Sequence, residues 1–493
     1  MSATASLSNR LMSGAAGAVL LLCAGCSTSS LFVSYPKQVN PLLQDLRAGR
    51  PAPVESRFGN KADSADRILY LAERGRIMQV QGNPQASLAD YRLAIAAVEA
   101  QENEADITVR GTVGQLGAVI GNDNVLPYRS AGYERVMLHH LQALNYLMAG
   151  DAQGAAVEVR QAGLEQRLAL DRHEKDIAKA KADAGSRRLD LGNADQRVAS
   201  AYAGLDEVAG KVKNSFQNAA TFFISGVIYE SAGQPNDAYI DYKKALEIMP
   251  TNVFLQQDVL RLARVLGMSE DVDQLKARYP GADLPPVPAG AGSVVLVIDD
   301  EFVPQKQQIK IPIPIISNGR YCGLVALAFP YYQTSARDPA PFTVDINGTR
   351  RGSTQVVCST RALAVKALKE RLPAMLIRQA IRASAKGIVA KELTDNYGPA
   401  AAIAASVVNY VTEQADLRSW CSLPDNVQIA RYALAAGNAQ VTVSQGALGP
   451  TAALNVRVAD RGVTVIYAKR AGSALYVQQT AFGPGGTLLA AGV

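Results

Sequence analysis

Histidine, tryptophan and cysteine are scarce in this chain, which has 3, 1 and 5 of them among 493 residues. So few histidines argue against a histidine-based metal site. The three cysteines beyond residue 26 have no CxxC spacing of the kind that binds zinc. The sequence also has no GxSxG, P-loop or HExxH motif, which are signatures of hydrolases, nucleotide-binding proteins and metalloproteases. We therefore expect no metal, no cofactor and no enzymatic activity.

Long apolar runs and strong net charge are also missing. Beyond residue 26, no stretch reaches the roughly 18 uncharged apolar residues of a membrane-spanning helix, and the Ala-rich run 399–411 is too short. The net charge of +6 is small for this length and does not indicate nucleic-acid binding. With 48% hydrophobic and 19% charged residues, the composition is that of a globular chain long enough for two or three domains.

The N-terminal segment has the pattern of an export signal. Arg10 carries a positive charge, and the apolar or small residues of Leu11–Leu22 have the length of a signal-peptide core. The segment Ala24–Cys26 then resembles the bacterial lipobox, in which small residues precede a cysteine that is lipidated and becomes the new N-terminus. Cys23 departs from that pattern, because leucine is usual at its position.

We predict a lipoprotein signal peptide over residues 1–25, a lipid on Cys26 and a lipidated tether over residues 26–60. Ser27 follows the cysteine in place of aspartate, which in Gram-negative lipoproteins implies transfer to the outer membrane. Several acyl chains on one cysteine hold a protein firmly at a bilayer. The expected location is the periplasmic face of the outer membrane, with the lipid as the anchor. The alternative is an ordinary secretory signal cut nearby, with Cys26 as a thiol.

A pattern of small and aromatic residues repeats in the first half of the chain. The clearest copy consists of Phe222, Gly226, Tyr229, Gly233, Ala238, Tyr242, Ala245 and Pro250. Weaker copies in the same frame consist of Ala143, Tyr146, Gly150, Ala155, Val159 and Ala162, and of Gly75, Met78, Gly82, Ser87, Tyr91 and Ala94. These spacings are those of a tetratricopeptide repeat, a helix-turn-helix unit of about 34 residues whose small residues allow close helix crossing.

We therefore predict TPR-like helical repeats over residues 61–281. Two insertions interrupt them: a long loop over 102–130 and a charged, protruding helical hairpin over 165–214. Residues 251–279 are expected to add a terminal helix pair. The alternative is an unrelated helical bundle in which the small residues coincide by chance.

Strand signals dominate after a Pro/Gly-rich linker at 282–292. The predicted strands are Ser293–Ile298, Gln308–Ile315, Leu324–Tyr331, Phe342–Ile346, Val427–Tyr432, Ala439–Val443, Ala453–Val458, Val463–Ala468 and Leu475–Ala481. Over 360–414 the period becomes helical, which predicts two inserted helices. We predict an α+β chain in which residues 293–493 form an antiparallel β-sandwich-like domain with that helical insertion.

A basic stripe follows one face of the helix predicted in this insertion. Its residues are Arg371, Arg378, Arg382 and Lys386. Such a stripe can contact lipid phosphates, peptidoglycan carboxylates or an acidic partner. The alternative is a solvated face, or internal ion pairs with Glu413 and Asp416.

Three further features have both a functional and a structural interpretation. Trp420, the only tryptophan, is a candidate to line a ligand groove, and the alternative is an anchor between a helix and a sheet. The carboxylates of Asp299–Glu301 follow a predicted strand, where neighbours point to opposite faces, so we expect a solvated turn and not a catalytic pair. Cys322 and Cys358 are the favoured disulfide, although Cys421 is an alternative partner and unbridged thiols remain an alternative.

Three parts of the chain carry a family resemblance. They are Tyr133–Val136 together with Ala143–Leu147, the strand Lys310–Pro314, and Ala415–Trp420 together with Leu423 and Pro424. In combination they resemble a family of uncharacterised proteobacterial outer-membrane lipoproteins with tetratricopeptide-like repeats. Cys421 departs from the family, in which a small polar residue tends to follow the tryptophan. The resemblance extends over most of the chain and implies location and architecture, not an activity.

These observations predict a non-enzymatic adaptor or scaffold for protein–protein interaction in a cell-envelope complex. The lipid would hold it at the membrane, and the repeats would supply a concave surface for an envelope protein. We expect no nucleic-acid partner, and the sequence indicates neither the protein partner nor the oligomeric state. The alternatives are an activator of or accessory to cell-wall synthesis, or an assembly factor for an outer-membrane secretion or surface-appendage system.

The lipid anchor makes the first prediction. In Cys26→Ser the acyl chains have no thiol to attach to, so the protein should leave the membrane fraction or accumulate as an uncleaved precursor. Cell fractionation and incorporation of radiolabelled palmitate measure both effects, with Cys23→Ser as the matched control that keeps the label. Unchanged palmitate incorporation in Cys26→Ser would contradict the lipobox assignment.

Overall fold

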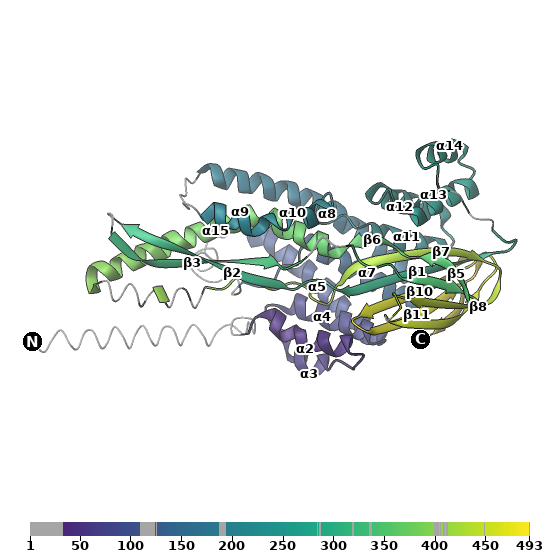
Figure 1. Cartoon of the computed structure of the whole chain (residues 1–493), viewed down its shortest axis with the longest axis horizontal. Helices are drawn as coiled ribbons and strands as arrows, with labels where there is room; N and C mark the ends of the chain where they lie inside the picture. The colour runs from purple at the N-terminus through teal and green to yellow at the C-terminus, as the bar shows by residue number, and fades with distance from the viewer. Residues whose placement is uncertain are drawn as a thin grey trace, which may run out of the picture.

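The computed structural model combines helices and strands in one chain (Figure 1). It describes residues 33–108, 124, 126–186, 194–282, 284, 287–317, 320–334, 338–398, 404, 406, 407, 410, 413–447 and 449–492. The predicted signal peptide and Cys26 lie outside these residues, and so does most of the second inserted helix. Among the helices that the structure describes, none combines the length and the apolar composition needed to cross a bilayer.

The helices and strands follow one another in two blocks. The helices are α2 (Tyr35–Arg47), α3 (Val54–Phe58), α4 (Arg67–Val80), α5 (Pro84–Thr108), α7 (Gly132–Met148), α8 (Ala152–Ser186), α9 (Ala194–Ala203), α10 (Asp206–Gly210), α11 (Ala219–Ser231), α12 (Pro235–Ile248), α13 (Val253–Val265), α14 (Ser269–Arg278) and α15 (Thr360–Tyr397). The strands are β1 (Gly292–Phe302), β2 (Lys306–Ser317), β3 (Arg320–Tyr332), β4 (Thr343–Ile346), β5 (Thr349–Ser353), β6 (Gln355–Ser359), β7 (Pro424–Leu434), β8 (Gly437–Ser444), β9 (Thr451–Val458), β10 (Val463–Ala471), β11 (Ala474–Phe482) and β12 (Leu488–Gly492).

Three helical hairpins, α4–α5, α7–α8 and α11–α12, coincide with the three copies of the sequence pattern. Each turn contains a glycine in the left-handed region, at which other residues are strained: Gly82 (φ +80°), Gly150 (φ +82°) and Gly233 (φ +74°). These glycines end the first helix of each hairpin and allow the second helix to turn back against it.

Close crossing within the hairpins explains the small residues of the pattern. A Cβ atom added to Gly226 in α11 would overlap the buried ring of Tyr242 in α12, and one added to Gly75 in α4 would lie 2.6 Å from the ring of Tyr91 in α5. In the middle hairpin, the buried Ala143 takes the place of the glycine. The smaller Val159 takes the place of the tyrosine, so volume is conserved across the pair.

The strands form a six-stranded sheet of order β12-β11-β10-β1-β7-β6, a four-stranded sheet of order β5-β4-β8-β9, and the hairpin β2-β3. All nine predicted strands are present, and β5, β6 and β12 were not predicted. The purely antiparallel arrangement was wrong in one pair: β1 and β10 are parallel, with Ser293 opposite Val463. The chain reaches β10 only after crossing to the second sheet, and this crossover permits the parallel pairing.

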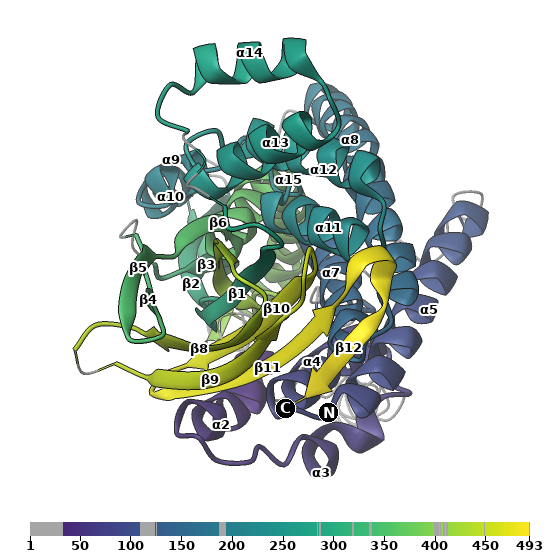
Figure 2. The same ribbon diagram turned by 90° about the vertical axis from the view of Figure 1, so that its right-hand side faces the viewer.

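The central strands of the six-stranded sheet, β1 and β10, are buried on both faces (Figure 2). Along β1, Val294 and Leu296 pack with the four-stranded sheet, whereas Val295 and Val297 belong to the core shared with the helices. The segment 282–292 therefore separates helical from strand-rich sequence but does not separate two cores. The sheet packs against α4, α7 and α11, the first helices of the hairpins. The first helices of the hairpins are thus covered by the chain's own sheet.

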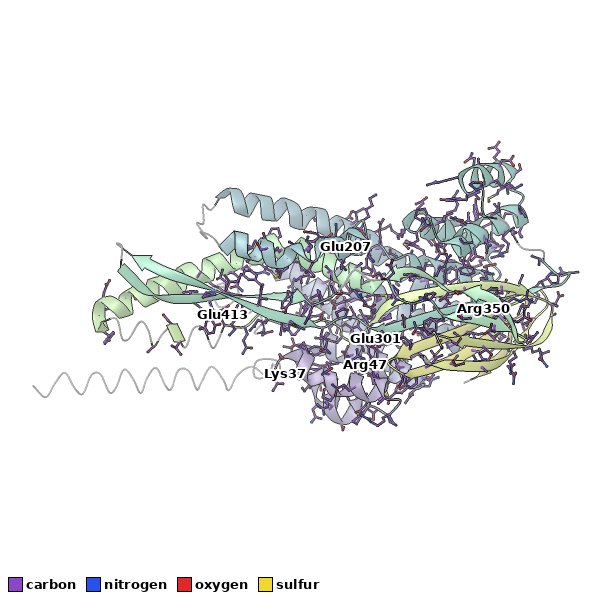
Figure 3. The ribbon with its side chains drawn as sticks, in the orientation of Figure 1. Lys37, Arg47, Glu207, Glu301, Arg350 and Glu413 are labelled. Atoms are coloured by element: carbon purple, nitrogen blue, oxygen red, sulfur yellow. The ribbon has the colours of Figure 1, made fainter. Side chains whose placement is uncertain are left out.

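The N-terminal helices belong to the folded body. Tyr35, Leu46 and Phe58 are each at most 1% exposed. The Arg47 Nε atom donates a hydrogen bond of 2.7 Å to Glu301 in β1, and the two side chains meet in Figure 3. The predicted tether over 26–60 is therefore wrong for residues 35–58, which form α2 and α3 and pack on the body.

An elongated arm extends from the body, formed by α8, α9, α15 and the β2-β3 hairpin (Figure 1). The predicted helical hairpin at 165–214 is part of it, but its first half is a continuation of α8, the second helix of the middle hairpin. The first predicted inserted helix is α15, which runs unbroken for 38 residues and contains Pro373. The arm meets the body where α15 packs on α7 and β7.

The Gly226–Tyr242 crossing generates a stability prediction. Gly226→Ala forces a methyl group against a ring that cannot move aside, because the Tyr242 hydroxyl is bonded to Glu230 and Arg431. Such overpacking should lower the free energy of unfolding by about 1–3 kcal/mol in urea denaturation. The matched control is Gly163→Ala in α8, because no neighbouring side chain lies within 4 Å of a Cβ atom added there. It should raise the free energy of unfolding by about 0.5–1 kcal/mol, because glycine disfavours helix. Equal stability of wild type and Gly226→Ala would contradict the close crossing.

Candidate functional site

A cavity of about 660 Å³ lies where the helical hairpins, the β2-β3 hairpin and α15 meet. We call it the junction cavity. Its walls come from the start of α4, the end of α5, the segment before α7, strands β2 and β3, α15 and the segment 413–420. This volume is in the range of roughly 300–1,000 Å³ that is typical of ligand sites.

Apolar and mostly small side chains line much of the junction cavity. We call them the apolar floor: Ile68, Ala97, Ala131, Ala328, Phe329, Ala364, Ala367, Leu368 and Met375. The five alanines leave room that larger side chains would fill. The floor can therefore accept an apolar group from a ligand.

One wall is held by a buried arginine. Arg418, with 2% of its side chain exposed, donates hydrogen bonds to Asp66 Oδ1 (2.6 Å), Asp416 Oδ2 (2.8 Å) and the Leu126 carbonyl (2.8 Å). Burial alone would raise the pKa of Asp416, but its hydrogen bonds and proximity to Arg418 lower it instead. Asp66 also accepts a bond of 3.1 Å from the Tyr128 amide. This cluster joins the start of α4 to the segments on either side of the cavity.

Glu134 holds the adjacent wall. It accepts hydrogen bonds from the Tyr128 hydroxyl (2.5 Å), the Ala131 amide (2.7 Å) and the Trp420 amide (2.9 Å). Burial, followed by the negative charge of Glu134, raises the pKa of Tyr128 well above its ordinary value. Lys306, whose pKa is lowered by burial, donates a bond of 2.8 Å to the Arg418 carbonyl. These groups are committed to the fold and shape the cavity.

Trp420 also has a structural position. Its side chain is buried, its ring meets that of Tyr91 edge-on at 5.9 Å between centroids, and its Nε1 atom donates to Ser422 Oγ (3.1 Å). It anchors the segment 413–420 to α5 and is not accessible to a ligand. The groove-lining role considered for Trp420 is therefore wrong, and the alternative, an anchor, describes it.

Four exposed arginines surround the junction cavity, and we call them the rim arginines: Arg67, Arg129, Arg371 and Arg378. None of them forms an ion pair or hydrogen bond with any residue in the part of the chain that the structure describes. Four carboxylates, Asp63, Glu104, Glu134 and Asp416, also line the cavity; Asp416 pairs with Arg418, and Glu104 already has an interaction. With Lys306 and Arg418 added to the rim arginines, the lining has six cationic side chains against four carboxylates.

The predicted basic stripe divides at this rim. Arg371 and Arg378 face the junction cavity, as a binding role requires. Arg382 is only 3% exposed, and Lys386 forms an ion pair with Glu413, as the alternative interpretation anticipated. Sequence reasoning missed Arg67 and Arg129, because no spacing connects these distant residues to α15.

Gln379 contributes an unusual polar atom to the cavity wall. The side chain is 4% exposed, and its Nε2 atom donates a bond of 3.0 Å to the Ala328 carbonyl. Its Oε1 atom has no hydrogen-bond partner among the described residues. A buried acceptor without a partner at the wall of a cavity suits a donor on a ligand.

The carboxylates after Val297 are not a solvated turn, so that prediction was wrong. Asp299 is 1% exposed, lies 2.6 Å from Arg76 Nη2 and accepts a bond from the Tyr467 hydroxyl. Asp300, on the opposite face as expected, is 2% exposed and pairs with Arg470. Both carboxylates are neutralised inside the fold, which explains how they tolerate burial.

The described cysteines are free thiols and do not line the junction cavity. Cys358 is a free, buried thiol in β6, which contradicts the predicted disulfide with Cys322, whose side chain lies outside the described ones. Burial raises the pKa of Cys358 to about 12, so this thiol is unreactive at neutral pH. Cys421 is also free and buried. Within the described ranges, no three His, Cys, Asp or Glu side chains gather as metal ligands.

The two kinds of arginine at this site lead to a prediction. Arg418→Met would leave Asp66 buried without its cation, which should lower the free energy of unfolding by about 3–5 kcal/mol. The same substitution at the exposed rim, Arg378→Met, should change it by no more than about 0.5 kcal/mol. Urea denaturation compares the two variants, and similar losses at both positions would show that Arg378 is part of the fold's support.

Comparison with models of known protein families, with curated proteins and with solved structures finds no match for this chain. The resemblance to outer-membrane lipoproteins therefore stays a prediction. The junction cavity, with its apolar floor and rim arginines, is the feature on which a function can be argued.

Proposed function

We propose that this chain is a non-enzymatic adaptor of the cell envelope, held at the periplasmic face of the outer membrane by a lipid on Cys26. The observation that carries the proposal is the set of four exposed rim arginines, unpaired with any described residue, around an apolar floor. Exposed cations beside an apolar depression provide both the attraction and the buried contact that binding to another protein requires.

The proposal includes a finer description of the fold. The Gly–Tyr crossings and left-handed turn glycines support TPR-like repeats in the helical half, and the core between the two sheets supports a β-sandwich-like strand domain. Because the sheet covers the first helices of the repeats, the partner binds at the junction cavity and not along the repeat face. The repeats then act as the support on which the cavity is built.

Site-specific photo-crosslinking in living cells tests the adaptor role. A photoreactive amino acid at Arg378 should give discrete protein adducts in the membrane fraction, because this position faces the proposed partner. The control is Arg350, an exposed arginine on β5. In Figure 3 it lies far from Glu413, which pairs with Lys386 on α15, the helix that carries Arg378. The absence of protein adducts at Arg378, or the same adducts at both positions, would overturn the proposal.

A further inference from the structure

We infer that the junction cavity binds an extended, acidic peptide segment of the partner, with carboxylates at the rim arginines and an apolar side chain on the floor. This inference rests on the proposed adaptor function and adds the chemistry of the bound segment. Three independent features of the cavity support it: the charge of the rim, the composition of the floor and the free acceptor on Gln379.

The rim selects negative charge. Arg67 comes from α4, Arg129 from the segment before α7, and Arg371 and Arg378 from α15, so cations from three elements surround one opening. Like charges placed together repel one another, and a carboxylate brought among them removes that repulsion. Guanidinium groups also match carboxylates in shape and bind them through two parallel hydrogen bonds. A segment that carries Asp or Glu side chains fits this rim.

The floor selects an apolar group between those carboxylates. Leu368 and the half-buried Met375 line the cavity from α15, and the surrounding alanines leave the space open. Burial of one Leu- or Phe-sized side chain contributes about 1.5–3 kcal/mol. A ligand that is charged throughout would leave this surface unused, so the bound segment combines acidic and apolar residues.

Gln379 favours a polypeptide over an anionic lipid. Its buried Oε1 atom accepts hydrogen bonds and has no partner among the described residues. A polypeptide offers one N–H donor per residue apart from proline. The phosphodiester and acyl chains of a lipid offer none, so a lipid supplies a donor only through a headgroup hydroxyl or amine. Because Nε2 is committed to the Ala328 carbonyl, Gln379 cannot turn its amide to present a donor instead.

Peptide selection on the full chain, purified in a mild non-ionic detergent, tests the inference. A phage library of random 12-residue peptides is the probe, and the enriched peptides should combine Asp or Glu with an apolar residue. Fluorescence anisotropy then measures their Kd. The double variant Arg371→Ala/Arg378→Ala should raise Kd about tenfold or more, as expected for the loss of two guanidinium–carboxylate pairs. Arg350→Ala/Arg351→Ala, which removes two exposed arginines on β5, should leave Kd unchanged.

The Gln379 contact has its own readout. Peptides that are N-methylated at one amide at a time each lack one N–H donor. One of them should bind the wild-type chain about tenfold more weakly and should show no such loss on Gln379→Leu, because the two changes remove the same hydrogen bond. If no amide shows this coupling, the proposed contact with the peptide backbone is wrong.

The experiments distinguish failure of the acidic-peptide inference from failure of the adaptor proposal. Selected peptides without an acidic bias, or peptides that bind the rim variant as well as wild type, would exclude the acidic segment. Nanodiscs of phosphatidylglycerol that bind wild type but not the rim variant, with no acidic peptide selected, would assign the cavity to lipid. If photo-crosslinking at Arg378 still gives protein adducts when the peptide or the nanodisc experiment goes against the acidic segment, only the inference is overturned. Acidic-peptide binding without such adducts would overturn only the adaptor role.

Discussion

The structure depends on charged side chains that are neutralised between the helices and the six-stranded sheet. Asp299 of β1 and Arg76 of α4 are each 1% exposed and lie 2.6 Å apart. Leaving either charge buried alone would cost about 3–5 kcal/mol, so the sheet and the first hairpin can pack only where the two side chains meet. Arg431 of β7 makes a similar connection to Glu230 of α11, at 2.6 Å. Together the two pairs fix the helices along the sheet.

The junction cavity follows from this arrangement. With α4 and α7 held against the sheet, their neighbouring ends lie beside the β2-β3 hairpin and α15, which extend past the body. Arg418 repeats the same device on a smaller scale, because its pair with Asp66 holds the segment 413–420 against α4. The arginines of the chain thus have two roles that their exposure separates. Buried ones join distant segments, whereas the rim arginines are exposed and unpaired with any described residue.

The strand predictions were correct where the sequence has a clear local periodicity. Alternating apolar residues identified nine strands, since a strand with one face in a core repeats every second residue. Strand β5 was missed because Thr349–Ser353 is mostly exposed and has no apolar alternation. Asp299 and Asp300 were misjudged for the opposite reason. Adjacent carboxylates after an apolar run usually meet solvent, and only the positions of Arg76 and Arg470 make their burial tolerable.

The sequence by itself determined the helical hairpins, most of the strands and the placement of Arg371 and Arg378 on one helix face, because these depend on residues a few turns or strand positions apart. Only the tertiary structure decided that β1 and β10 run parallel, that the sheet covers the first helices, and that Arg67 and Arg129 join the same rim. Each of these depends on segments far apart in the chain, as Ser293 and Val463 are, 170 positions apart. These segments come into contact where their apolar faces are buried and their buried charges are paired at the same time. A local sequence pattern does not contain that information.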